Sequence, residues 1–348
     1  MKIGLILASN IWFSPYLSIY TNILDNNKVD YTIISWNRDG RDKPIGYQYD
    51  ELLEGPARFN SYRRYARFVK KVIQHEKIDR LILFGPQEAI LLSDLLIRYK
   101  KKYIVDYRDL SIEQKIGFKQ IYSLILKNSY ANIISSPGFK KCLPKNEYLI
   151  SHNFNIDIVK KTLDLEEKKD YNINNKIDIL TIGGIRDYSS NIEIVKALAN
   201  SSDFKCRFVG KGNASEKIES YCKENNIKNV YFQGYYPKEE EPIHIKESTF
   251  MNIFYPRIIT HDTAMSNRFY NSLIYKKPMI VTKNTTQGDY AEKYKVGVVL
   301  DDCHNLKNKL LNFLETDFSE YAKNCNKLLS LFLEDEKEFV NKIEEFIS

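Results

Sequence analysis

Residues 265–282 read MSNRFYNSLIYKKPMIVT, and this stretch predicts a helix, a Lys-Pro turn and a buried strand. Ser266 and Asn267 are good helix N-caps, and the free N–H groups and positive dipole end of such a helix attract anions, most commonly diphosphates. Helical spacing places Arg268 and Asn271 on the same face as Asn267 near that end. The stretch therefore predicts an anion site at the N-terminus of a helix that precedes a strand. An ordinary capped surface helix would show the same pattern.

The chain on both sides of this stretch alternates short apolar runs with helical patterns, which is typical of parallel sheets covered by helices. The first series of strands is expected at 2–9, 29–36, 79–85, 102–109, 131–136 and 147–154, with helices at 12–25, 57–77, 87–100 and 111–130. The second series is expected at 177–184, 204–212, 229–236, 250–256, 278–283 and 296–302, with the last helices at 304–347. The predicted fold is α/β, with two doubly wound Rossmann-like domains whose parallel sheets face a cleft.

Length and composition agree with two domains. A chain of 348 residues is too long for one ordinary core, and 43% apolar with 28% charged residues is typical of a globular protein. We expect the first domain at 1–160, a polar linker at 161–176 and the second domain at 177–330. Residues 331–348 are expected to form a C-terminal helix that packs back on the first domain.

The net charge of +7 is unevenly distributed. Residues 1–160 carry 25 Lys and Arg against 16 Asp and Glu, a net of +9, whereas the remainder carries 27 against 29, a net of −2. The cations of the first part cluster at 63–71 and 98–102. A surface this basic can approach anionic lipid, because each Lys or Arg near a membrane contributes about 1 kcal/mol; a solvated helix face is the competing interpretation. No nucleic-acid-binding module is recognised, so nucleic acid is not an expected partner.

Several chemistries are disfavoured because their patterns are absent from the sequence. No window approaches the roughly 18 apolar residues of a membrane span, and the N-terminal run KIGLILA favours a strand over a signal peptide. The five cysteines are scattered without CxxC or His pairing, as in reduced cytoplasmic proteins. The absence of a P-loop, of GxGxxG after the first strand, of HExxH and of GxSxG disfavours an ATPase, a Rossmann dehydrogenase, a zinc enzyme and a hydrolase.

The opening stretch resembles the donor-binding segment of GT-B nucleotide-sugar glycosyltransferases, particularly bacterial capsular and surface polysaccharide enzymes. In that family a helix capped by small residues carries a basic residue and then a Glu, followed by a Gly/Lys-Lys-Pro turn and a strand. Arg268 stands at the basic position, and residues 275–278, Tyr-Lys-Lys-Pro, supply the turn. Asn271 replaces the Glu that binds the ribose, and the upstream acid expected near Thr263 is missing.

The resemblance implies a hexosyltransferase-type glycosyltransferase that uses a nucleotide-diphosphate sugar, with a UDP-sugar expected, and a glycan acceptor. A lipid-linked oligosaccharide is the expected acceptor, in surface polysaccharide biosynthesis by a cytoplasmic protein that is peripheral at the inner face of an anionic membrane. Because no Asp-x-Asp occurs, catalysis is expected to need no metal, and no cofactor is expected. A sugar-nucleotide 2-epimerase of the same fold and a catalytically inactive GT-B subunit are the alternatives.

By the same resemblance, the second domain binds the nucleotide sugar through loops that follow its strands. Arg186, in the loop with Gly183 and Gly184, is assigned to the β-phosphate, since glycines allow close approach and Arg can bind phosphate bidentately. The other donor-binding residues are expected to be Gly210, Lys211, Tyr235, Tyr236, Tyr255, Ser266, Asn267 and Asn271. Plain Gly turns and core tyrosines are the competing interpretations.

The first domain is expected to bind the acceptor. Asp109 ends a buried strand and is the expected carboxylate at the reacting centre, although a helix cap or an ion pair with Arg108 would look the same. Asn10 and Phe13, after the first strand, and Arg108 are the expected acceptor-binding residues. His261 is expected to be an exposed loop histidine. The catalytic residues are thus expected to be Asp109 together with Arg186 and Arg268, which would neutralise the departing diphosphate.

Overall fold

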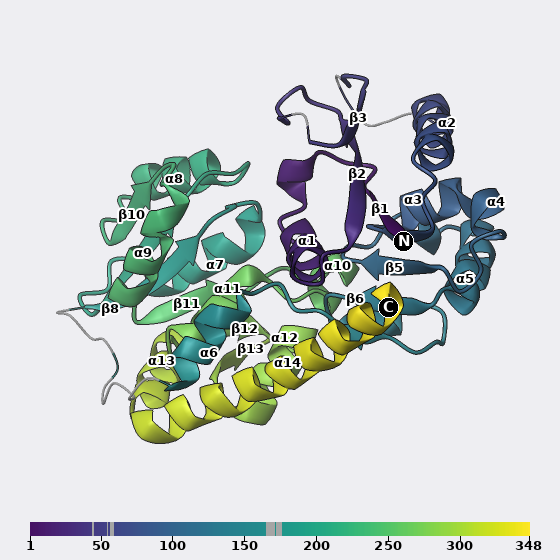
Figure 1. The fold of residues 1–348 in the computed structure, drawn as a ribbon. Coiled ribbons are helices and arrows are strands. Elements are labelled where there is room, and N and C mark those ends of the chain that lie inside the picture. The colour runs from purple at the N-terminus through teal and green to yellow at the C-terminus, as the bar shows by residue number, and fades with distance from the viewer. Residues whose placement is uncertain (44, 54, 56–58, 165–170, 172–175) are drawn as a thin grey trace. The chain divides into compact units, whose positions relative to one another are not determined.

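The computed structural model describes the whole chain except residues 44, 54, 56–58, 165–170 and 172–175. The chain divides into two compact units, which Figure 1 shows as ribbons coloured along the sequence. Unit 1 comprises Met1–His152 and Glu334–Ser348, and unit 2 comprises Asn153–Leu333. Residues 153–160, which the sequence analysis assigns to the first domain, therefore lie in unit 2, and most of the expected linker lies outside the described residues.

Unit 1 is built on a seven-stranded parallel sheet in the order β3-β2-β1-β4-β5-β6-β7. Leu5 of β1 is in register with Ile33 of β2 on one side and with Ile82 of β4 on the other. The strands are β1 (Lys2–Ile6), β2 (Asp30–Asn37), β3 (Tyr47–Asp50), β4 (Arg80–Leu83), β5 (Tyr103–Tyr107), β6 (Ala131–Ile134) and β7 (Leu149–Ile150). The sequence analysis missed β3, because this edge strand is polar and only half-buried and so lacks the apolar run of the others.

Helices connect these strands and cover the sheet of unit 1. They are α1 (Leu17–Asn26), α2 (Phe59–His75), α3 (Pro86–Leu91), α4 (Ser93–Leu96) and α5 (Phe118–Asn128), with the 3-10 helices η1 (Ile11–Phe13), η2 (Ile112–Gln114) and η3 (Pro137–Lys141). The end of α14 also belongs to this unit, because Phe339, Ile343 and Phe346 are buried in one core with side chains of β1, α1 and β4.

Unit 2 is built on a six-stranded parallel sheet in the order β10-β9-β8-β11-β12-β13. Its strands are β8 (Ile177–Ile182), β9 (Phe204–Val209), β10 (Val230–Gln233), β11 (Phe250–Ile253), β12 (Met279–Thr282) and β13 (Gly297–Leu300). Its helices are α6 (Ile156–Asp164), α7 (Tyr188–Leu198), α8 (Ser215–Glu224), η4 (Lys238–Glu240), α9 (Glu241–Glu247), α10 (Ile259–Thr263), α11 (Asn267–Ile274), α12 (Thr286–Tyr294) and α13 (Leu306–Leu314).

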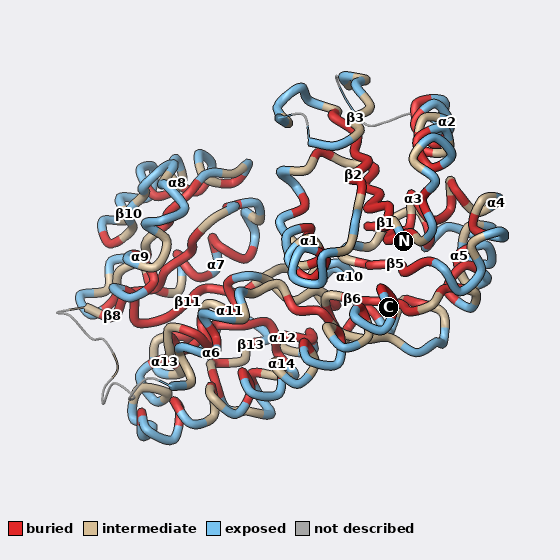
Figure 2. Tube along the Cα trace, viewed as in Figure 1, coloured by how far each residue is buried: buried red, intermediate tan, exposed pale blue. Residues whose placement is uncertain are grey.

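The two sheets share one topology. In each, the first strand in the chain lies inside the sheet, and successive strands are added first on one side and then on the other, as in doubly wound Rossmann-like folds. Figure 2 shows the strands largely in red, since they are buried by helices on both faces. The predicted α/β fold with two parallel sheets is confirmed.

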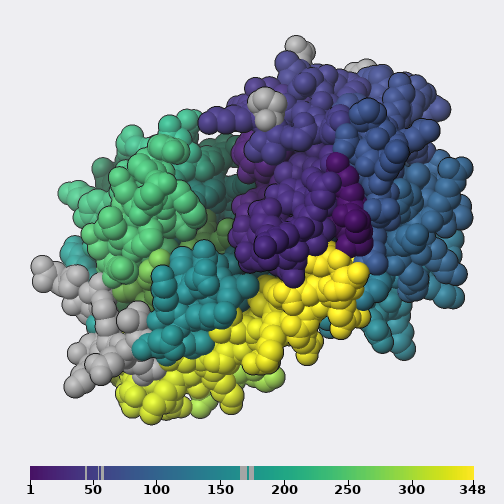
Figure 3. Space-filling view, in the orientation of Figure 1, coloured from purple at the N-terminus to yellow at the C-terminus, as the bar shows by residue number. Residues whose placement is uncertain are grey.

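Two helices differ from the sequence-based expectation. The start of the expected linker, residues 161–164, belongs to the helix α6 (Ile156–Asp164), in which Val159 is completely buried in the core of unit 2. The C-terminal helix begins at Phe318 rather than at 331, and α14 (Phe318–Ile347) runs unbroken for 30 residues. Its exposed face is the yellow band of Figure 3. The helix passes from unit 2 to unit 1 at Leu333–Glu334.

Candidate functional site

A cavity of about 670 Å³ lies within unit 2, where the loops after β8, β9, β10 and β11 meet the start of α11. This is the carboxyl edge of the sheet next to the point where the strand order reverses, and ligands of doubly wound folds bind there. The cavity is lined by Ile182, Gly183, Gly184, Arg186, Asp187, Gly210, Lys211, Tyr235, Tyr236, Lys238, Glu241, Tyr255, His261, Ala264, Ser266, Asn267, Arg268, Asn271 and Gln287. All the donor-binding residues expected from the sequence, together with Arg186 and Arg268, are brought together around it.

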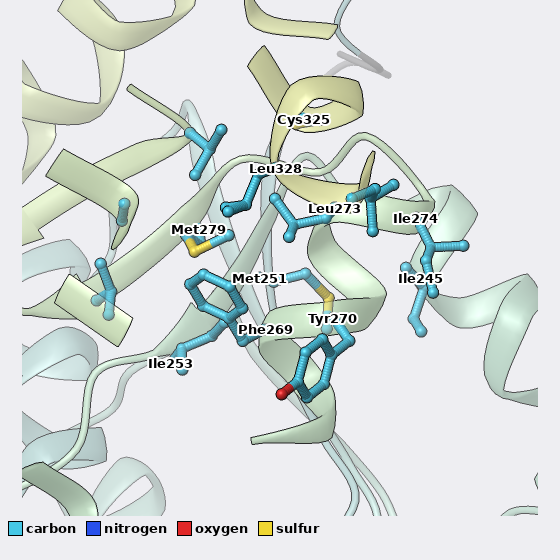
Figure 4. Close-up of a cluster of buried hydrophobic side chains, with 14 of the residues drawn as sticks. Ile245, Met251, Ile253, Phe269, Tyr270, Leu273, Ile274, Met279, Cys325 and Leu328 are labelled. Carbon is cyan, nitrogen blue, oxygen red and sulfur yellow. The ribbon is translucent and has the colours of Figure 1, made fainter. Parts of the chain in front are cut away.

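The N-terminus of α11 is held in place by its own cap. Ser266 has an extended backbone, and its hydroxyl accepts a hydrogen bond from the Phe269 N–H at 3.3 Å. The backbone N–H and the hydroxyl of Ser266 both donate to Oε1 of the buried Gln287. Phe269 and Leu273 point into the core, as Figure 4 shows, so the helix cannot turn its polar face away from the cavity. The helix predicted from residues 265–282 is confirmed.

Glycines allow two loops of the cavity to pack backbone against backbone. A Cβ on Gly210 would lie 2.1 Å from the Gly183 carbonyl oxygen, and a Cβ on Gly212 would lie 2.1 Å from that of Ile185. Gly210 also has φ of +124°, which L side chains rarely adopt. The sequence analysis expects Gly210 to bind the donor, and the structure shows that Gly210 and Gly212 also let one loop pack closely on the other.

Two cations face the cavity with their charges available. Arg186 is exposed, and its guanidinium has no hydrogen bond or ion pair to any residue that the structure describes. The Lys211 ammonium likewise has no partner within the described part of the chain. Guanidinium and ammonium groups bind phosphate oxygens by charge-assisted hydrogen bonds, which are roughly twice as strong as neutral ones. The two side chains therefore give the cavity lining two cations that are able to bind an anion.

Arg268 is placed differently from Arg186. Its side chain is buried, and its guanidinium donates to the carbonyl oxygens of Ile182 at 2.6 Å, Gly184 at 2.9 Å and Asn252 at 3.4 Å. These bonds fix the glycine loop after β8 against α11. Arg268 thus brings positive charge to the cavity wall, but most of its hydrogen-bonding capacity serves the protein rather than a ligand.

A carboxylate stands beside Asn271, although the sequence analysis expected none there. Glu241, at the start of α9, accepts hydrogen bonds from Asn271 Nδ2 at 2.9 Å, Tyr236 Oη at 2.8 Å and Lys238 Nζ at 2.6 Å. Burial, together with this carboxylate, raises the pKa of Tyr236, which therefore stays a neutral donor. Sequence reasoning missed Glu241 because it stands in the run Lys-Glu-Glu-Glu at 238–241. Such a charged run is typical of the exposed start of a helix.

A second acid in the cavity is Asp187, the N-cap of α7. His261, expected to be an exposed loop residue, is only partly exposed; it lines the cavity with Nε2 3.9 Å from the Asp187 carboxylate and its ring against Tyr255. Asp262, the neighbouring acid, points elsewhere and pairs with Arg257 through contacts of 2.7 and 3.1 Å. Of the residues that the structure describes, Asp187 and Glu241 are the acids that line this cavity.

The acceptor-binding residues expected in unit 1 lie near the carboxyl ends of β1 and β5. Asn10 is buried, and its side-chain amide binds Asn37, Asp39 and the backbone N–H of Arg38, so it braces the loop after β1. Phe13 is exposed and stacks on Trp12 with ring centroids 3.6 Å apart.

Arg108 is committed to the interior of unit 1. Its guanidinium binds both oxygens of the buried Asp106 at 2.7 and 2.8 Å and donates to the Ser151 carbonyl at 2.9 Å. Tyr20 completes the network by donating to Asp106 at 2.7 Å. The geometry thus gives Arg108 a structural role and gives no support to acceptor binding. The expected ion pair of Arg108 with a nearby acid forms with Asp106, and Asp109 is exposed just after β5.

Among the described residues, no group of three or more His, Cys, Asp or Glu side chains could hold a metal ion. None of the described helices combines the length and apolar character that a membrane span requires.

No protein-family model matches this sequence, and no curated protein sequence matches it. Solved structures nevertheless match almost the whole chain. HepE of Anabaena in complex with UDP has a TM-score of 0.69 at 11% identity, covering 99% of this chain and 100% of that chain. The lipopolysaccharide outer core galactosyltransferase WaaB, in its apo form, has a TM-score of 0.70 at 12% identity, covering 99% of each chain.

A structure with a different activity also matches. The UDP-GlcNAc 2-epimerase of Methanocaldococcus jannaschii, in complex with UDP-GlcNAc and UDP, has a TM-score of 0.55 at 15% identity, covering 96% of this chain and 100% of that chain. The chain therefore has the GT-B fold, and the resemblance inferred from residues 265–282 is confirmed at the level of the fold. The fold alone does not separate a transferase from an epimerase.

Proposed function

We propose that this chain is a glycosyltransferase that binds a nucleotide-diphosphate sugar in the unit 2 cavity and transfers the sugar to a glycan. The observation that carries the proposal is the composition of one cavity wall. Arg186 and Lys211, which have no partner among the residues that the structure describes, line the same cavity as the capped N-terminus of α11. Fixed positive groups of this kind stabilise a departing diphosphate without reorganisation.

UDP is the proposed nucleotide, since UDP is bound in the HepE structure and UDP with UDP-GlcNAc in the epimerase structure. The proposed reaction is hexosyl transfer without a metal ion, because cations and the helix dipole can offset the diphosphate charge. Asp109 remains the proposed reacting carboxylate of the first domain. Arg268 is proposed to act on the diphosphate through its charge while it holds the glycine loop.

The donor site is tested by thermal shift of the full-length protein with UDP, GDP, CMP and dTDP. A nucleotide present at 100 times its Kd stabilises a protein by about 2.7 kcal/mol, which raises the Tm by several degrees. We expect UDP to give the largest shift. If none of the four nucleotides raises the Tm, the cavity is not a donor site.

Transfer is tested by UDP release from UDP-glucose, UDP-galactose and UDP-N-acetylglucosamine with a lipid-linked oligosaccharide fraction as acceptor. We expect release to depend on the acceptor and to survive EDTA. Loss of release in EDTA with recovery in Mn²⁺ or Mg²⁺ would contradict the metal-independent reaction.

A sugar-nucleotide 2-epimerase is the second candidate, and one observation favours it. Nε2 of His261 lies 3.9 Å from the Asp187 carboxylate in the lining of the cavity, and such groups can move protons on a sugar. Incubating UDP-N-acetylglucosamine with the protein and no acceptor, followed by proton NMR, distinguishes the candidates. A transferase leaves the C2 configuration unchanged, whereas an epimerase inverts it. A protein that binds UDP but neither transfers the sugar to an acceptor nor inverts C2 would be an inactive GT-B subunit.

Peripheral binding to an anionic membrane is the proposed location of the reaction, and unit 1 carries the charges. The two basic clusters of the sequence meet at a second cavity of about 570 Å³ between α2 and α4. Lys70, Lys77 and Arg98 line it together with Asp94, which pairs with Lys70 at 2.6 Å. Ile97, beside Arg98, leaves 77% of its surface exposed. Such a surface fits anionic headgroups above an apolar layer.

Membrane binding is tested by sedimentation with phosphatidylglycerol vesicles. Because the Debye length falls to about 3 Å at 1 M salt, a salt wash should release the protein. Charge reversal at the cluster of Arg63, Arg64, Arg67, Lys70 and Lys71 should weaken vesicle binding and leave UDP binding intact. Binding that ignores both salt and charge reversal would leave these clusters as solvated helix faces.

A further inference from the structure

The Glu241 carboxylate in the cavity is fixed in orientation from three sides. Its side chain is only 12% exposed. Oε1 accepts from the Asn271 amide of α11, and Oε2 accepts from the Tyr236 hydroxyl and the Lys238 ammonium. A buried carboxylate costs free energy unless it is paired and hydrogen-bonded, and these donors supply both requirements. The arrangement leaves a preoriented acceptor at the cavity wall.

Tyr236 connects this carboxylate to the predicted diphosphate site. Its hydroxyl lies 3.9 Å from the position that a Cβ on Gly183 would take, so Glu241 is one hydrogen bond away from the glycine loop that carries Arg186. The ribose of a nucleoside diphosphate is bonded directly to its α-phosphate. Hydroxyl-binding groups are therefore needed next to the diphosphate site, which is where Glu241 lies.

Glu241 and Asn271 together offer acceptors for two hydroxyls. A carboxylate has about four lone-pair positions, of which three are used here. Asn271 donates its amide N–H to Glu241, and its Oδ1 has no hydrogen bond to any residue in the described parts of the chain. An acid that accepts from ribose hydroxyls is the usual way in which Rossmann-like folds hold a nucleotide.

We propose that Glu241 is the residue that binds the ribose hydroxyls of the nucleotide, with Asn271 orienting the carboxylate and accepting from a second hydroxyl. This inference rests on the proposed function, because it assumes a nucleoside diphosphate in the cavity. The inference places the ribose-binding carboxylate on α9 rather than on α11, because the α11 residue Asn271 carries no charge. Specificity for ribose over deoxyribose then depends on a contact between two helices.

The test compares the affinities of UDP and 2′-deoxy-UDP for the full-length protein by isothermal titration calorimetry. A hydrogen bond to a charged group should make the wild type prefer UDP by roughly 10- to 100-fold. Glu241→Gln should reduce that preference to about threefold or less, because the amide cannot supply a charged acceptor. Glu239→Gln is the matched control, since Glu239 is exposed on η4 and does not line the cavity; it should retain the wild-type preference.

The ratio of the two affinities reports only on folded protein, so partial unfolding of a variant does not change it. Asn271→Ala provides a second variant, and it should also lower the preference because it removes one acceptor and the donor to Oε1. If the wild type shows no preference, or if both variants keep it, the ribose assignment is wrong while the donor site stands. If the wild type binds neither UDP nor 2′-deoxy-UDP, the assignment and the proposed UDP site are both wrong.

Discussion

Arg186→Ala is the substitution that tests the donor site most directly. The Arg186 side chain is exposed and makes no hydrogen bond or ion pair with any residue that the structure describes. Its removal therefore takes no interaction away from the folded protein, and surface changes of this kind are usually within about 0.5 kcal/mol. For a unit of this size, that corresponds to a Tm change of about 2 °C or less.

Nucleotide binding should respond far more strongly than stability. Loss of a hydrogen bond from a charged group costs about 1.5–3 kcal/mol, which raises the Kd for UDP roughly 10- to 150-fold. Arg186→Lys should fall between wild type and Arg186→Ala, because an ammonium keeps the charge but cannot bind two phosphate oxygens in the bidentate geometry. The measurement is isothermal titration calorimetry with UDP at 0.15 M salt.

Arg257→Ala is the matched control. This arginine also lies in unit 2 after a strand, but its guanidinium pairs with Asp262 and it does not line the cavity. It should leave the Kd for UDP unchanged. An unchanged Kd for UDP in Arg186→Ala would refute the placement of the diphosphate beside Arg186. An equal rise of the Kd in Arg257→Ala would refute it too, because the effect would then come only from the net charge of the protein.

Three further outcomes follow from the structure. Arg268→Ala should lower the Tm in calorimetry as well as weaken UDP binding, because its guanidinium holds the carbonyls of Ile182 and Gly184; an unchanged Tm would contradict this structural role. Asp109→Asn should lower kcat roughly 100-fold with little change in Tm, and a fully active variant would remove Asp109 from the reacting centre. Burial raises the pKa of Glu336 from 4.5 to about 8, so the folded state holds a proton that the unfolded state loses. Stability should therefore fall as pH rises from about 4.5 to about 8, and Glu336→Gln should flatten that part of the Tm curve, whereas an unchanged slope would show that Glu336 titrates normally.

Most of the fold was predictable because its signals are local. Short apolar runs predicted every strand of unit 2 and all but one of unit 1, since strands buried on both faces are apolar throughout. The polar edge strand β3 carries no such run. The first turns of α6 were also missed, because a nine-residue helix with one fully buried side chain, Val159, has too little apolar periodicity to stand out from a polar segment.

The sequence by itself determined which loops would meet. In a parallel doubly wound sheet the segments that follow the strands gather at one edge, so a glycine loop with Arg186 and a capped helix at Ser266 had to lie near each other. What each side chain does there was decided by contacts between residues far apart in the chain. Arg268 reaches the Ile182 carbonyl across 86 positions, and Asn271 meets Glu241 across 30. Patterns of spacing and capping report on neighbours along the chain, whereas the partners of a buried cation or amide depend on how helices pack on the sheet, and only the tertiary structure shows that packing.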